Sequence, residues 1–352
     1  MNLRVIFIAS GLLLLGCSSN GDGSSSSDAE HQREVIEGMH QSLLSDLEVL
    51  HGAAGDLRDA APAPDGRGWD AGEDEEAIAS MTEAWIRARS AYERVEGAIA
   101  PLFPDLDRAI DARYEDFLQE LGDDGDQDLF DDQGVTGMHA IERILYVPTT
   151  PESVVEVEST LLGYQAAAWP ATEAEAAEFK EKLAARLVAD TQELRDQWQP
   201  QHIDLAGAFE GLVSLMNEQR EKVNKAASEE EESRYAQRTM ADLRDNLAGT
   251  TNIYALFQSW LLTKPDGAEI DSDIEAAFDA LDTAYSDVNG DSIPRPPETW
   301  SSESPSKADL GTPFGRLYQA VQDAVDPNRA GSAVDGMNRA AVVLGLMEPA
   351  DG

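Results

Sequence analysis

Apolar residues recur at every third or fourth position along most of the chain, which is the spacing of amphipathic helices. The first such stripe contains Val35, Met39, Leu43 and Leu47. The spacing predicts helices at residues 30–52, 74–100, 105–121, 136–147, 153–168, 203–227, 233–262, 271–288, 314–325 and 331–346, with a further long helix between Thr172 and Pro200. No segment alternates apolar and polar residues as a strand does. We therefore expect an all-α protein.

The predicted helices suit two up-and-down bundles of the four-helix type in tandem. We place the first bundle at about residues 29–200 and the second at about 201–346, because Pro200 ends a long helix. Thr172, with Glu175 three positions later, forms a capping-box pattern at the start of that helix. The acidic run at residues 229–232 is expected to be a solvated turn or a helix start.

An acidic loop at residues 123–132 suggests calcium binding through Asp124, Asp126 and Asp128. An EF-hand loop needs glycine at its sixth position and a bidentate glutamate at its twelfth. Leu129 stands at the first of these positions and a valine at the second. We therefore expect a solvated loop here and no EF-hand.

The first 17 residues resemble a bacterial lipoprotein signal. Arg4 supplies a positive charge, residues 5–15 are an apolar run too short for an ordinary membrane span, and Leu-Leu-Gly-Cys ends at Cys17. We expect Cys17 to be lipidated and to anchor an exported protein in the cell envelope, at the outer membrane, the periplasmic face or the cell surface. An ordinary signal peptide with a chance cysteine is the alternative. Residues 18–28 are expected to be a flexible tether.

The chain is strongly acidic, with 68 Asp and Glu against 26 Lys and Arg and a net charge of −42. This charge repels nucleic acid and anionic membranes and attracts cations. It is spread along the whole chain, which is also typical of general solvation in salty habitats. Cys17 is the only cysteine, so a metal site must use His, Asp and Glu. These ligands favour iron, manganese, zinc, calcium or magnesium.

His139 and Glu142 are the strongest candidates for chemistry. They are three residues apart, so on a helix the imidazole and the carboxylate share one face. Gly137 has no Cβ and allows another backbone to approach the start of this helix. A second pair with the same spacing, His31 and Glu34, fits a solvated helix face. The neighbours of His139 must therefore decide the interpretation.

Carboxylates on two other predicted helices can supply these neighbours. Glu93 and Glu96 are three residues apart, and Asp107 and Asp111 are four apart. If these helices pack with the helix of His139 in one bundle, Glu96 and Asp111 can face the histidine. Carboxylates and one imidazole presented from several helices make a metal site of the kind found in helical bundles. The alternative is that all of these residues lie on the surface.

Three ordered segments, 92–96, 107–113 and 137–146, resemble the imelysin family, whose Gly-x-His-x-x-Glu motif is met by residues 137–142. Residues 233–249 are similar to a helix in the second half of its iron-uptake members. The family includes the peptidase M75 group and the EfeO and EfeM periplasmic iron-uptake proteins.

The resemblance implies a double four-helix bundle with a metal site between or within the bundles. It implies that His139 and Glu142 are the motif ligands, that Glu96 and Asp111 are their acidic partners, and that Glu93 is a further ligand. It also implies a cell-envelope lipoprotein that binds iron, or alternatively zinc, calcium or magnesium, and functions in metal uptake. The expected partners are the membrane, through the lipid on Cys17, and an iron permease or another envelope protein.

Two other functions remain open. A metallopeptidase of the M75 type would need a zinc motif, but Ala140 follows the histidine and Arg143 follows the glutamate, so neither HExxH nor HxxEH is present. Enzymatic activity is therefore not favoured. A scaffold or ligand-binding lipoprotein could use the long loop at residues 290–313 and its Trp300, although Trp300 also fits an anchor that packs the loop on the body.

Overall fold

The computed structural model describes residues 22–198 and 203–348, and every regular element within these ranges is a helix. The predicted all-α fold is confirmed. The α-helices are α1 (Asp22–Ala60), α2 (Glu75–Glu93), α3 (Glu96–Leu102), α4 (Pro104–Asp111), α5 (Tyr114–Leu121), α6 (Gly137–Leu145), α7 (Glu152–Glu158), α8 (Glu173–Glu178), α9 (Ala184–Trp198), α10 (Leu205–Lys225), α11 (Thr239–Leu261), α12 (Gly267–Ser286), α13 (Pro313–Val325) and α14 (Ala333–Leu344).

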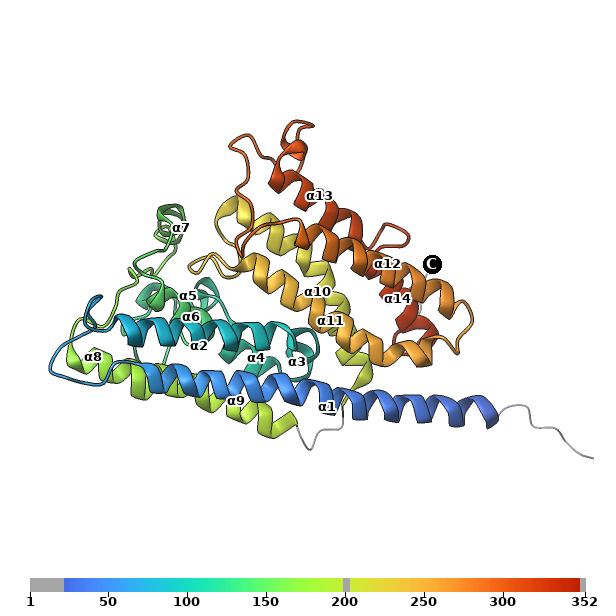
Figure 1. Ribbon diagram of the computed structural model, residues 1–352, viewed down its shortest axis with the longest axis horizontal. Coiled ribbons are helices and arrows are strands. Elements are labelled where there is room, and N and C mark those ends of the chain that lie inside the picture. The colour runs from blue at the N-terminus through green and yellow to red at the C-terminus, as the bar shows by residue number, and fades with distance from the viewer. Residues whose placement is uncertain (1–21, 199–202, 349–352) are drawn as a thin grey trace, which may run out of the picture.

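The helices form two groups that share α1 as a common edge (Figure 1). One part of α1 packs against α2 and α9, and the other packs against α11. Helices α10 to α14 pack on one another in the second group, with α12 against α11, α13 and α14. Helix α9 ends at Trp198 and α10 begins at Leu205, close to the predicted boundary at residue 200.

The predicted apolar stripes form the interior. Val35, Met39, Leu43 and Leu47 of α1 are all buried. The capping box at the start of α8 is present, with the Thr172 hydroxyl accepting from the amide of residue 175 and the Glu175 carboxylate accepting in return. A π-helical stretch, Phe179–Leu183, joins α8 to α9 within the segment predicted as one long helix.

Two glycines allow the helix groups to approach closely beside the candidate site. A Cβ on Gly211 of α10 would overlap the carbonyl oxygen of Gly97 on α3. A Cβ on Gly249 of α11 would overlap the carbonyl oxygen of Arg94, directly after α2. Only glycine permits these contacts. They bring α10 and α11 against the junction of α2 and α3.

At four places a predicted helix breaks, ends early or begins late, and α1 (Asp22–Ala60) is also eight residues longer at each end than the predicted 30–52. The helix predicted at 74–100 breaks between Glu93 and Glu96, and the one predicted at 105–121 breaks after Asp111. The helix predicted at 153–168 ends at Glu158, and the one predicted at 233–262 begins only at Thr239. Three of these breaks, at residues 94–95, 112–113 and 229–238, surround the candidate site described below.

The predicted tether is partly helical. Residues 22–28 belong to α1, and the Asp28 carboxylate accepts from Lys264 at 2.8 Å and from the Trp260 indole at 3.0 Å. The predicted signal at residues 1–17, with Cys17, lies outside the described residues. In the part of the chain that is described, no helix is both long and apolar enough to span a membrane.

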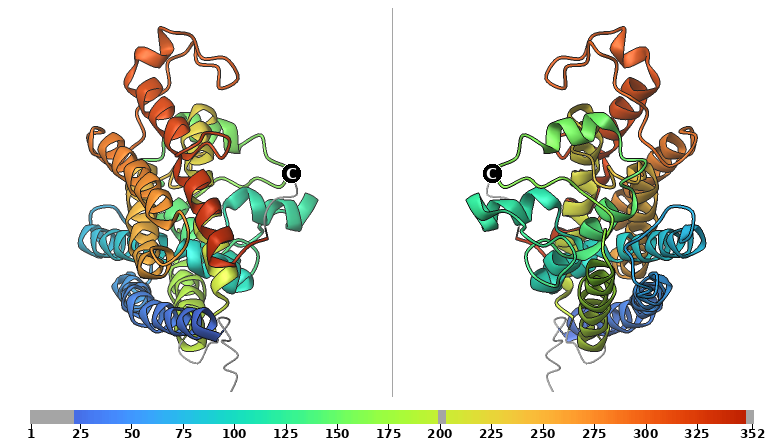
Figure 2. Two further views of the ribbon diagram at one scale, coloured as in Figure 1. Left: turned by 90° about the vertical axis from the view of Figure 1, so that its right-hand side faces the viewer. Right: turned by 90° about the vertical axis from the view of Figure 1, so that its left-hand side faces the viewer.

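The predicted loop at residues 290–313 extends from the start of α11 to the side of the molecule opposite α1, and a short 3₁₀ turn, Asp309–Gly311, precedes α13 at its end (Figures 1 and 2). Trp300 packs edge-on against Phe314 and Tyr318 of α13, with ring centroids 4.7 and 4.8 Å apart. Trp300 therefore anchors the loop to the body of the protein.

Candidate metal centre

Helix α6 begins at a position that only glycine fits. Gly137 has a φ of +83°, and a Cβ there would lie 2.6 Å from the carbonyl oxygen of Ile110 in α4. The predicted close approach of another backbone at Gly137 is thus confirmed. It places the start of α6 against the end of α4, so that His139 comes to lie near Asp111. Both His139 and Glu142 are buried.

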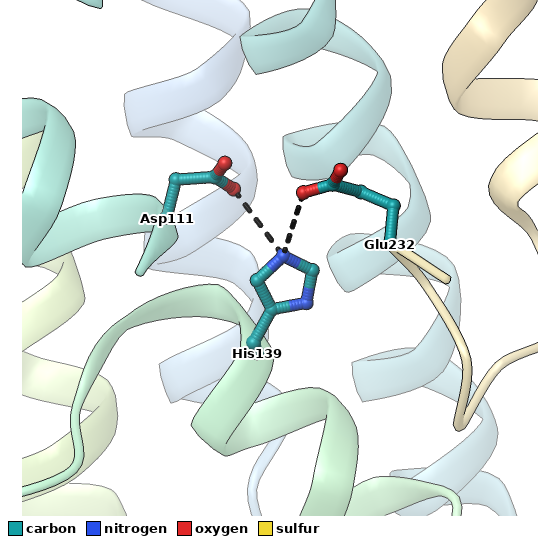
Figure 3. A group of neighbouring side chains, drawn as sticks. All are labelled: Asp111, His139 and Glu232. Carbon is teal, nitrogen blue, oxygen red and sulfur yellow. Dashed lines mark ion pairs between the residues drawn. The ribbon is translucent and has the colours of Figure 1, made fainter. Parts of the chain in front are cut away.

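Three side chains from separate segments meet at one point (Figure 3). Nε2 of His139 lies 3.6 Å from Oδ1 of Asp111 and 3.6 Å from Oε1 of Glu232. One ligand atom from each residue lies within 4.8 Å of the others. Asp111 ends α4, His139 is in α6, and Glu232 belongs to the segment that precedes α11.

The Nε2 atom of His139 is buried and has no hydrogen-bond partner among the described residues. Its two 3.6 Å contacts are too long for hydrogen bonds. They lie just above the separation of two ligands that share one ion, which is about 3.0–3.5 Å when each ligand is about 2.1 Å from the ion. A nitrogen and two carboxylate oxygens form a donor set that iron, manganese and zinc accept.

Glu142 contacts the other nitrogen of the same imidazole. Its Oε2 lies 2.8 Å from Nδ1 of His139, while its Oε1 accepts a hydrogen bond from the Ala236 amide at 2.8 Å. A carboxylate on Nδ1 fixes the proton there and leaves Nε2 facing Asp111 and Glu232. Glu142 thus lies on the Nδ1 side of the imidazole, outside the group of Asp111, His139 and Glu232.

Glu93 and Glu96, the other two predicted ligands, lie nearby but face cations of the protein itself. Nζ of Lys222 on α10 lies 3.3 Å from Glu96 and 3.7 Å from Glu93. The amide of Asn246 on α11 donates to both carboxylates, at 2.6 Å to Glu93 and 2.8 Å to Glu96. Neither glutamate belongs to the three-residue group that His139 forms.

Arg89 neutralises the other side of the cluster. Its guanidinium is fully buried and forms close ion pairs with Asp111 and Glu93. It also lies 3.5 Å from Glu232 and 3.6 Å from Asp242. An unpaired carboxylate is costly to bury, so the arginine stabilises the cluster in the absence of a metal.

The surroundings shift the titration of all three members of the group. Burial and Arg89 lower the pKa of His139, but its contacts with Glu142 and Glu232 and the charge of Asp111 outweigh them and raise it to about 9. Burial raises the pKa of Asp111 to about 7 against the opposing effect of Arg89. Burial also acts to raise the pKa of Glu232, but Lys222, His139 and Arg89 hold it well below its usual range. A metal at this position must therefore replace a proton on His139.

A cavity of about 270 Å³ reaches the group. Its lining includes Asp111 and Glu232 together with Glu96, Glu218 and Lys222. A neighbouring cavity of about 400 Å³ between α3 and α10 shares Glu96 and Glu218 with it. Acidic side chains thus line the space next to two of the three candidate ligands, which favours a cation there.

Glu232 was not among the predicted ligands. Residues 229–232 were predicted to be a solvated turn or a helix start, but Glu231 is only 6% exposed and the Glu232 side chain only 11%. Local pattern gave no sign of this burial. The one available signal was position, because this acidic run directly precedes residues 233–249, which carry part of the family resemblance.

A buried polar network holds the segment that carries Glu232. Arg234 pairs with Glu115 of α5 at 2.6 Å and lies 3.5 Å from Glu158 of α7. Glu158 also accepts from the hydroxyl of Tyr235 and pairs with Arg143 of α6 at 2.8 Å. The segment that precedes α11 is thereby tied to α5, α6 and α7.

These features define an all-helical protein in which a buried histidine and two carboxylates, each from a different segment, converge beside an acidic cavity. The chain belongs to the imelysin family: the family model for imelysin, peptidase M75, matches residues 36–336. Curated relatives agree with this assignment.

An EfeM/EfeO family lipoprotein of Staphylococcus haemolyticus is 25% identical over 291 residues, which are 82% of this chain and 87% of that protein. A lipoprotein of the same family from Staphylococcus aureus strain MSSA476 is 27% identical over 216 residues, which are 60% of this chain and 62% of that protein. The iron uptake system component EfeO of Yersinia pseudotuberculosis is 27% identical over 206 residues, which are 58% of this chain and 44% of that protein. The match thus spans less than half of the Yersinia protein.

Proposed function

We propose that this protein is a lipid-anchored protein of the cell envelope that binds an iron or other divalent cation through Asp111, His139 and Glu232 and serves in metal uptake. Glu142 orients the imidazole of His139. The single observation that carries the proposal is the Nε2 atom of His139, which is buried, faces two carboxylates at 3.6 Å and has no hydrogen-bond partner among the described residues.

The donor set narrows the choice of metal. One imidazole and two carboxylates, without a thiolate, suit iron, manganese or zinc better than a soft metal. The name of the Yersinia relative, an iron uptake system component, favours iron. Calcium and magnesium remain alternatives that a titration separates, because both prefer oxygen ligands only.

The surroundings suit a protein that binds its metal reversibly. Arg89 and Lys222 pair with the carboxylates when no metal is bound, so an ion can leave without exposing buried charges to one another. The net charge of −42 attracts cations toward the surface. Lipidation at Cys17 would hold the protein at the membrane, where an iron permease or another envelope protein could receive the ion.

A metal titration tests the proposal. Purified protein is titrated with Mn²⁺, Zn²⁺, Ca²⁺ and, under anaerobic conditions, Fe²⁺, and compared with the variant that combines His139→Ala and Glu232→Gln. The matched control combines His31→Ala and Glu34→Gln, because His31 and Glu34 have the same spacing and lie 3.3 Å apart on the surface of α1.

We expect one tight ion per chain in the wild type and in the control, and its loss in the site variant. Preference for Fe²⁺ or Mn²⁺ over Ca²⁺ would support the role of His139. Weak binding that is the same in all three proteins would contradict the proposal and favour a scaffold without a metal.

A further inference from the structure

The ammonium group of Lys222 is enclosed by oxygen atoms. Its Nζ lies 3.3 Å from Glu96, 3.4 Å from Glu232 and 3.7 Å from Glu93, and 3.2 Å from the side-chain oxygen of Asn246. The residue is only 5% exposed. Four oxygens from α2, α3, α11 and the segment before α11 thus surround one positive charge.

This arrangement differs from an ordinary salt bridge. Charge-assisted hydrogen bonds are typically about 2.7–2.9 Å long, and each of the four distances around Nζ is longer. Lysine therefore shares its charge among three carboxylates instead of pairing with one. Three carboxylates and an amide oxygen are also the ligand types that hard divalent cations prefer.

The oxygens are held in place by groups other than Lys222. The Asn246 amide donates to Glu93 and Glu96, and Arg89 contacts both Glu93 and Glu232. Oε1 of Glu93 forms the ion pair with Arg89, while Oε2 accepts from Asn246 and faces Lys222. The oxygen cage therefore does not depend on the lysine alone for its shape.

We propose that Lys222 is a built-in substitute for a second metal ion. Its ammonium occupies a cage formed by Glu93, Glu96, Glu232 and Asn246 that binds a divalent cation when the lysine is removed. Lys222 thus limits the protein to one ion, at the neighbouring position of Asp111 and His139. Glu232 lies between the two positions and contacts both Lys222 and His139. This inference deepens the proposed function and rests on it.

The presence of Lys222 in the cage affects how the protein captures and releases a metal ion. With Lys222 in place, the carboxylates are assembled and partly neutralised before any metal arrives, so loading does not require them to be brought together against their mutual repulsion. Only one ion then has to leave when the protein delivers its cargo. In a protein with two adjacent divalent ions, Glu232 would lie between the ions and contact both of them.

The test is the number of ions bound per chain in Lys222→Ala and in Lys222→Arg. Alanine removes both the charge and the side-chain volume from the cage, whereas arginine keeps the charge and is the matched control. Mn²⁺ is the probe, counted by isothermal titration calorimetry and by the loss of the free-ion signal in electron paramagnetic resonance. We expect one ion in the wild type, two in Lys222→Ala and one in Lys222→Arg.

The outcomes separate this inference from the proposed function. One ion in the wild type and still one in a folded Lys222→Ala variant would overturn the inference and leave the proposed function intact. No ion in the wild type but one in Lys222→Ala would contradict the proposed function and support the cage. Adding Glu96→Gln to Lys222→Ala should then lower the affinity for the additional ion at least tenfold. An unchanged affinity would overturn the assignment of the cage.

Removal of Lys222 can also prevent folding, because three buried carboxylates would lose their counter-charge. If Lys222→Ala lacks the helical circular dichroism signal, it is titrated with Mn²⁺. Recovery of the signal with two ions per chain would support the proposal, and no recovery at saturating Mn²⁺ would contradict it.

Discussion

Metal binding should depend on pH because the metal and a proton compete for His139. The pKa of His139 is raised to about 9, so at pH 7 about one molecule in a hundred has the neutral imidazole that can bind a metal. Each pH unit below 9 should weaken the apparent affinity about tenfold, which corresponds to about 1.4 kcal/mol. Because only the neutral imidazole binds a metal, the metal affinity rises as the pH rises toward 9 and levels off above it.

Below pH 7 a second proton enters the competition. The pKa of Asp111 is raised to about 7, chiefly by burial, so in more acidic solution the metal must replace a proton on this carboxyl as well. The slope of the logarithm of Kd against pH should therefore steepen from about one toward two below pH 7. Acidification should release the ion efficiently.

The assay is isothermal titration calorimetry with Mn²⁺ under anaerobic conditions, between pH 5.5 and 8.5, in buffers of different ionisation enthalpy. The buffer dependence of the heat gives the number of protons released, which we expect to be about one per ion at pH 8. The His31→Ala variant serves as the control and should keep the same slope. A Kd that does not change between pH 7 and 8.5, with no proton released, would show that the metal and a proton do not compete for His139.

Three further predictions concern residues around the site. Glu142→Gln should weaken metal binding by about 10- to 100-fold in calorimetry, because it loosens the orientation of the imidazole. Glu34→Gln on α1 should have no effect on the affinity. Equal affinities in the two variants would argue against the orienting role of Glu142. Gly137→Ala should destabilise the protein by about 2 kcal/mol or more, since it combines a positive φ with a clash against α4. The melting temperature measures this loss. Gly52→Ala, whose added Cβ meets no atom within 4 Å, should not lower the melting temperature. Glu158→Ala should cost about 3–5 kcal/mol in urea unfolding, because the buried Arg143 loses its partner; a loss below about 1 kcal/mol would show that the network contributes little.

The helical fold was predictable because the apolar stripes are long and regular. The stripe at Val35, Met39, Leu43 and Leu47 is fully buried, as its spacing requires. The break between α2 and α3 was not predictable, since neither proline nor glycine stands at residues 94–95. It arises where Gly249 of α11 presses against the carbonyl of Arg94, and such a contact between distant segments leaves no trace in local periodicity.

The candidate site was predictable only in part, for the same reason. The sequence predicted that Asp111 can face His139, and in the structure Oδ1 of Asp111 and Nε2 of His139 lie 3.6 Å apart. Gly137 indicated the close approach, but the helix boundary directly after Asp111 was not predicted. Glu93 and Glu96 were expected to face the metal, but their orientation depends on Lys222 and Asn246, which lie more than a hundred positions away. Their role as ligands, like that of His139, stays a prediction.

Glu232 is the clearest case of a site residue that local sequence patterns do not reveal. A run of four glutamates reads as a solvated surface segment, because unpaired carboxylates are rarely buried. Burial becomes possible here only because Lys222, Arg89 and His139 supply compensating charge from three different helices. No local feature of the run indicates those partners.

A crystal structure of the protein grown with Mn²⁺, with the ion located by anomalous diffraction, tests most directly whether one cation binds between Asp111, His139 and Glu232. We expect one strong anomalous peak within bonding distance of Nε2 of His139 and of a carboxylate oxygen of both Asp111 and Glu232. A peak elsewhere, for example in the acidic loop at residues 123–132, or an imidazole of His139 that contacts no ion, would contradict it.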